Sequence, residues 1–79
     1  MEQLIVKMES FKSNFLVNRQ EISYLRWIIE SYDGIAFLKT IDPDKAIIEL
    51  EVSPGCDLFI TELLDFLREN EHMQIDKIM

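Results

Sequence analysis

The chain has 79 residues, of which 48% are hydrophobic and 29% are charged. A chain of this length forms one domain with a small core, and this balance excludes the disordered class. With a formal net charge of −7, the chain lacks the excess of lysine and arginine that phosphate binding requires. We therefore expect no nucleic-acid partner and no anionic membrane partner.

The acidity belongs to the second half of the chain. Residues 1–41 hold five acidic and five basic residues, so their charges cancel. Residues 42–79 hold ten acidic and three basic residues and carry the whole net charge. We expect this acidic half to influence the solubility of the chain and its choice of partner.

Nothing in the sequence indicates export or membrane insertion. No apolar stretch approaches the ~20 residues that span a bilayer, and the N-terminus has no signal-peptide cleavage site. Cys56 is the single cysteine, so an intrachain disulfide is impossible. A cytoplasmic location is the resulting expectation.

Residues 1–10 are predicted to be an N-terminal extension to a single domain over residues 11–79. Leu4 and Val6 are apolar at even positions, whereas Phe15 and Val17 are apolar at odd positions. A continuous strand keeps one phase, because a slip of one residue turns every side chain to the other face. The change of phase near residues 9–10 predicts a bulge or a separate extra strand.

A strand ending at Val17 is followed by a predicted helix over residues 19–32. Asn18 is suited to cap this helix, and Glu21 stands at the position of a capping box. Gly34 is suited to the left-handed conformation beyond the helix end. An apolar stripe at helical spacing predicts the buried face, formed by Ile22, Leu25, Ile28, Ile29 and Tyr32.

Two strands are predicted at 35–41 and 46–52, joined by a turn at 42–45. Asp42 and Pro43 favour this turn, because proline fixes its own φ angle and aspartate bonds the backbone nearby. The first strand is apolar on both faces. The second alternates, with Glu49 and Glu51 opposite the apolar positions.

A second helix is predicted over residues 55–70, and Ser53 is suited to cap it. A last strand is predicted over residues 72–78. The buried face of this helix is predicted from its apolar residues, Phe59, Ile60, Leu63, Phe66 and Leu67. The order of elements predicts an α+β fold. It is a ferredoxin-like βαββαβ two-layer sandwich, with a four-stranded antiparallel sheet and two helices on one face.

Three short motifs carry a family resemblance. They are Y-x-G-x-A at residues 32–36, T-x-D-P at residues 40–43 and V-x-P at residues 52–54. Over residues 15–70 the chain resembles a family of small bacterial proteins known only as a domain of unknown function. The resemblance implies a C-cap, a turn and a helix entry, and it implies no activity.

The predicted topology is also similar to ACT domains, which bind amino acids in regulatory proteins. Those domains usually place a glycine between the first strand and the first helix, beside the ligand. The corresponding loop here is residues 18–20, which contain no glycine. The similarity of topology makes an ACT-like ligand-binding domain acting at a dimer interface the alternative hypothesis, and the missing glycine counts against it.

Exposed apolar side chains are the main functional signal. Trp27 lies ~160° from the centre of the first helix's apolar stripe, and Tyr24 is one turn earlier on the same flank. Either a partner chain or the Leu4–Val6 region could cover them. Phe37, Leu16 and Ile47 are expected on the open face of the sheet.

The sequence predicts no catalytic residue, no metal ligand set and no cofactor. Cys56 is a candidate reactive thiol, because a helix N-terminus favours the thiolate. The alternative is a small residue at a helix entry, since no base is positioned nearby in sequence. Our leading hypothesis is a non-enzymatic interaction or oligomerisation module that forms a homodimer or binds a protein partner.

Overall fold

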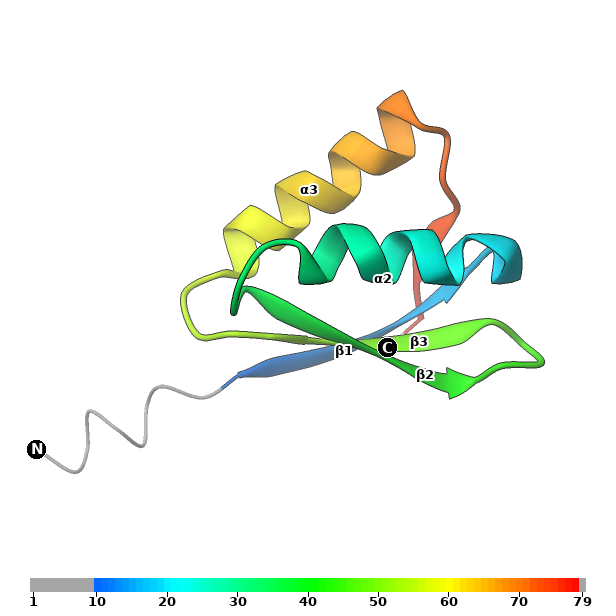
Figure 1. Cartoon of the computed structure of the whole chain (residues 1–79), viewed down its shortest axis with the longest axis horizontal. Helices are drawn as coiled ribbons and strands as arrows, with labels where there is room; N and C mark the ends of the chain where they lie inside the picture. Colours follow the sequence, from blue (N-terminus) through cyan, green and yellow to red (C-terminus); the bar gives the residue numbers. More distant parts are fainter. Residues whose placement is uncertain (1–9, 79) are drawn as a thin grey trace, which may run out of the picture.

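The computed structural model describes residues 10–78 (Figure 1). The predictions for Leu4 and Val6 lie outside these residues. The elements follow the chain as β1 (Phe11–Val17), a 3-10 helix η1 (Arg19–Glu21), α2 (Ile22–Glu30), β2 (Ala36–Asp42), β3 (Ile47–Val52), α3 (Asp57–Asn70) and β4 (Ile75–Lys77). The prediction of an α+β fold is confirmed.

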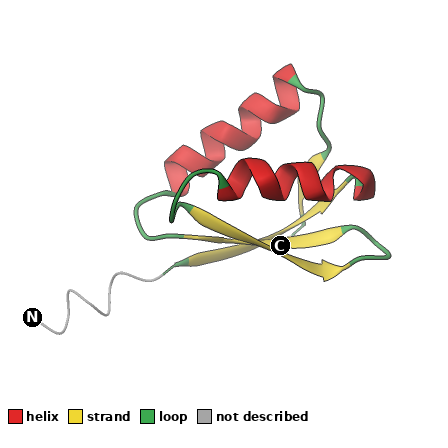
Figure 2. Cartoon of the chain, viewed as in Figure 1, coloured by secondary structure: helices red, strands yellow, loops and turns green. Residues whose placement is uncertain are grey.

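The four strands form one antiparallel sheet in the order β2-β3-β1-β4. Both helices lie on the same side of it, which leaves the opposite face of the sheet uncovered by the described residues (Figure 2). β3 pairs with β1 from Phe11 to Leu16, whereas β4 is paired only with Phe15–Val17. The first half of β1 therefore has a strand neighbour on one side alone among the described elements.

The core is a single apolar layer between the sheet and the helices. Each strand contributes every second residue, as its pleat requires, and each helix contributes one stripe. No polar side chain is buried among residues 10–78. The core residues are Phe15, Val17, Ile22, Leu25, Ile29, Ala36, Leu38, Ala46, Ile48, Leu50, Val52, Ile60, Leu64, Leu67, Met73 and Ile75.

The first helical segment is shorter than predicted. Asn18 does cap it, since its Oδ1 accepts the Gln20 N–H at 3.0 Å. The first turn is a 3-10 turn, so the α-helix begins at Ile22 and ends at Glu30. Gly34 has φ +74°, the left-handed conformation predicted for it.

The turn between β2 and β3 follows the prediction. The Asp42 Oδ1 accepts the N–H groups of Asp44 and Lys45, at 3.0 and 3.1 Å. The register shifts between Thr40 and Asp42, and β2 begins and ends one residue later than predicted.

The predictions for the second helix need two corrections. α3 begins at Asp57 rather than at residue 55, and Ser53 does not cap it but donates its hydroxyl to the Gly34 carbonyl. Phe59 and Phe66 were predicted to be buried and are exposed, with Phe66 54% accessible. The buried stripe is centred on Ile60, Leu64 and Leu67, and both rings lie roughly 110–130° from that centre.

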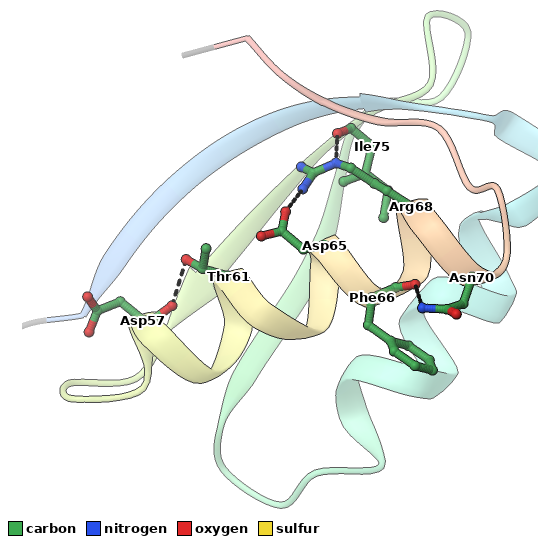
Figure 3. Close-up of polar contacts among 7 residues, drawn as sticks. All are labelled: Asp57, Thr61, Asp65, Phe66, Arg68, Asn70 and Ile75. Atoms are coloured by element: carbon green, nitrogen blue, oxygen red, sulfur yellow. Dashed lines mark hydrogen bonds and ion pairs between the residues drawn. The ribbon is translucent and has the colours of Figure 1, made fainter.

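The last strand is also shorter than predicted, because residues 71–74 form a connection. Arg68 fixes this connection to α3 (Figure 3). Its Nε donates to the Ile75 carbonyl at 2.7 Å, and its Nη1 pairs with Asp65 at 2.7 Å. His72 adopts a left-handed φ of 56° where the chain turns from the helix.

Candidate interaction surfaces

Two aromatic rings lie side by side on the outside of α2. The rings of Tyr24 and Trp27 are stacked, with centroids 6.4 Å apart and planes inclined by 16°. Trp27 is 68% exposed and Tyr24 is 44% exposed. Their helix buries Leu25 and Ile29 against the sheet, which directs these two rings outward.

The exposed rings of α3 continue this surface. The Phe59 ring lies edge-on to the ring of Tyr32, which follows the end of α2, and the two ring centroids are 5.1 Å apart. At the other end, the Tyr24 hydroxyl donates to the Glu71 carboxylate at 2.9 Å. We call this surface the aromatic face and define it by Tyr24, Trp27, Tyr32, Phe59 and Phe66.

The hydrogen bond to Glu71 changes the acidity of Tyr24. The carboxylate accepts a hydrogen bond from the phenol, which stabilises the protonated form and raises the pKa of Tyr24 above its ordinary value of 10.0. Partial desolvation and the negative charge of Glu71 act in the same direction. Tyr24 thus ties α2 to the residue that follows α3.

The charged neighbours of the aromatic face are acidic. Helix residues three or four positions apart are neighbours on the surface. By this rule Glu30 adjoins Trp27, Glu62 adjoins both Phe59 and Phe66, and Glu69 adjoins Phe66.

No lysine or arginine of α2 or α3 stands at such a spacing from Tyr24, Trp27, Phe59 or Phe66. The two arginines of these helices have other partners: the Arg26 guanidinium donates to the Thr40 hydroxyl, and Arg68 bonds Asp65 and Ile75.

The open face of the sheet brings only some of its predicted residues together. Leu16 and Ile47 are direct cross-strand partners, and both are half-buried. Phe37 is 58% exposed but lies two rows away from them. The row of Lys39 and Glu49 separates it from Ile47. The apolar surface of this face is therefore divided in two.

Charges of both signs alternate across this open face. Lys12 is the cross-strand partner of Glu51, and Lys39 is the cross-strand partner of Glu49. Opposite charges in such positions attract each other across a sheet. The open face thus differs from the aromatic face, whose charged neighbours at helical spacing on α2 and α3 are all acidic.

A hollow of about 440 Å³ is lined by residues of β1, β3 and α3. Its floor is apolar and includes Phe15, Ile60 and Leu64. Asp57 and Lys77 also line it. The loop at residues 18–20 lines neither this hollow nor the smaller one beside Tyr32 and Phe37. These hollows therefore lie away from the loop that the ACT resemblance points to.

Cys56 is half-buried at the residue before α3. Its Sγ lies 3.9 Å from the Pro54 carbonyl oxygen, and its side chain packs beside the core. Within residues 10–78, no three histidine, cysteine or acidic side chains gather closely enough to hold a metal ion. None of the helices in the described part of the chain is long and apolar enough to cross a membrane.

The sequence pattern missed the contribution of α3 to the aromatic face. The predicted buried face included Phe59 and Phe66 and left out Leu64, so it was turned away from the stripe that packs on the sheet. A wheel centred on the i, i+4, i+7 set of Ile60, Leu64 and Leu67 would have placed both rings outside the buried stripe.

Comparison with known proteins gives a family and no activity. No curated protein and no solved structure matches the chain significantly. One family model matches residues 15–70, which is most of the chain and contains both helices, β2, β3 and the end of β1. This bears out the resemblance to a family without a known role. The chain belongs to the family described as Domain of unknown function (DUF4911).

Proposed function

We propose that this domain is a non-enzymatic interaction and oligomerisation module with a ferredoxin-like sandwich fold, acting as a homodimer in the cytoplasm. One observation carries the proposal, namely that large apolar side chains remain exposed on the helices, on the sheet and just beyond their ends. They are Phe11, Tyr24, Trp27, Tyr32, Phe37, Ile41, Leu58, Phe59, Phe66 and Ile78. Exposed apolar surface of this kind is typical of association surfaces.

The open side of the sheet is the surface best suited to a second copy. Phe37 and Ile41 are exposed on β2, an edge strand of the described sheet, and Ile47 and Leu16 lie on the next two strands, β3 and β1. A chain of this size buries little surface on its own, so pairing would add to its stability.

The charges of the open face support self-association. A two-fold axis presents the same face of both copies to each other. Lys12 and Lys39 of one copy are then available to Glu49 and Glu51 of the other. A face with one sign of charge would instead repel its own copy.

Sedimentation equilibrium of the full chain tests the proposal directly. The chain has a mass of 9.4 kDa, and we expect a species of twice that mass at high micromolar concentration. Phe37→Ser combined with Ile41→Ser should shift the equilibrium toward the monomer. Phe66→Ser is the matched control, because it removes a comparably exposed ring from the helix side. A monomer mass for the unmodified chain at that concentration would contradict the proposal.

A further inference from the structure

The aromatic face offers side chains but no free backbone. The N–H and C=O groups within a helix are already bonded to each other, so a helix surface cannot extend a sheet. A segment that docks there must satisfy its own backbone groups, because leaving them buried and unpaired is costly. A helix meets this requirement, and its apolar stripe is suited to a row of exposed rings.

The size of the aromatic face suits such a segment. Phe59 and Phe66 are seven residues apart on α3, which corresponds to ~10 Å along the helix axis. Tyr24 and Trp27 add a second row on α2, and the Tyr24–Glu71 and Tyr32–Phe59 contacts connect the two rows. Aromatic side chains of this kind supply much of the binding free energy at protein interfaces.

The charge around the aromatic face selects among possible occupants. Glu30, Glu62 and Glu69 adjoin the rings, and no basic residue of α2 or α3 does so. A second copy would bring glutamate against glutamate, which is unfavourable. The occupant favoured by this arrangement carries lysine or arginine beside its apolar stripe.

We propose that the aromatic face binds a basic amphipathic helix of a partner protein. The apolar stripe of that helix covers Trp27, Tyr24 and Phe66, and its lysines or arginines approach Glu62 and Glu69. This contact does not depend on self-association through the sheet, so either proposal can fail while the other stands.

Trp27 is the single tryptophan of the chain and reports directly on the occupancy of this surface. The probe is a synthetic peptide of about 18 residues, made of leucine and lysine with the leucines on one helical face. Binding to the full chain should shift the Trp27 emission to shorter wavelength as the indole leaves water. Raising the salt from about 50 mM to about 500 mM should weaken binding by at least ~10-fold, because these charges are screened at the surface.

Two control peptides define the specificity. In one, glutamate replaces every lysine; in the other, the same residues are scrambled so that no apolar face remains. We expect neither to shift the Trp27 emission over the concentration range in which the first peptide saturates. Equal binding of either control would overturn the proposal, and so would the absence of binding by the first peptide.

Matched variants locate the contact. Phe66→Ser should weaken binding by ~10-fold or more, whereas Phe37→Ser, on the sheet side, should leave it unchanged. The pair Glu62→Gln and Glu69→Gln should weaken binding more than the pair Glu49→Gln and Glu51→Gln, which removes the same charge from the other face. Equal effects within either comparison would overturn the proposal.

The remaining occupants give different results. If a second copy occupies the aromatic face, the Trp27 emission shifts with protein concentration alone, and Phe66→Ser abolishes the shift. If residues 1–9 of the same chain occupy it, the emission of the isolated protein is already at short wavelength, and Leu4→Ser with Val6→Ser moves it to longer wavelength. Either result would overturn the proposal.

Discussion

Replacing Leu64 or Phe66 by alanine distinguishes the observed packing of α3 from the packing that its sequence pattern suggests. Leu64 is 3% exposed, and Phe66 is more than half exposed. A buried leucine replaced by alanine costs about 3 kcal/mol of unfolding free energy. The partly covered ring of Phe66 contributes about 1 kcal/mol through apolar burial, and the better helix propensity of alanine offsets about 0.5 kcal/mol of this.

Leu64→Ala should therefore lower the free energy of unfolding several times more than Phe66→Ala does, although leucine is the smaller side chain. Urea unfolding followed by circular dichroism at 222 nm measures both values. A domain of this length has a total stability of ~4–12 kcal/mol, so Leu64→Val serves as the milder variant if Leu64→Ala does not fold. Equal destabilisation by Leu64→Ala and Phe66→Ala would refute the assignment of the buried stripe.

Four further changes test the contacts at the end of α3. Arg68→Met removes the bond to the Ile75 carbonyl and should cost about 1.5–2 kcal/mol in urea unfolding, whereas Asp65→Asn, which removes only an exposed ion pair, should cost about 0.5 kcal/mol or less. His72→Gly relieves a left-handed φ and should raise the unfolding free energy by about 0.5–1 kcal/mol; a decrease would argue against this conformation. Glu71→Gln should return the pKa of Tyr24 toward its ordinary value, as read from tyrosinate absorbance. Because the folded pKa of Tyr24 is raised, its stabilising contribution is complete below pH 10 and is lost as the pH rises through the raised pKa.

Most of the fold could be predicted because local signals and the apolar pattern agree. As predicted, Asn18 caps the first helical segment, Asp42 bonds the turn after β2, and Gly34 is left-handed. The alternation of apolar and acidic residues in β3 identifies its buried face. The predicted ends of the helices and strands were wrong where details of the folded chain set them. A 3-10 turn begins the first helical segment, and the Arg68–Ile75 bond holds a connection in place of a longer strand.

The candidate surfaces could be predicted only in part. The outward position of Trp27 follows from its place opposite a clear apolar stripe. The exposure of Phe66 follows less directly, because α3 carries more apolar residues than one face can bury, and its sequence fits more than one apolar stripe. Likewise, the separation of Phe37 from Leu16 and Ile47 depends on strand register, which composition does not specify.

The position of β1 in the middle of the sheet has a consequence for the order of folding. The β2–β3 hairpin closes through a short turn. In contrast, β1 pairs with residues far away in the sequence, Phe11 with Val52 and Val17 with Ile75. Distant pairings cost more loop-closure entropy and form later. We expect the hairpin to be structured in the folding transition state and β4 to join afterwards. Substitutions in β4 should therefore accelerate unfolding more than they slow folding, and the first strand to leave the native protein should be the last one synthesised.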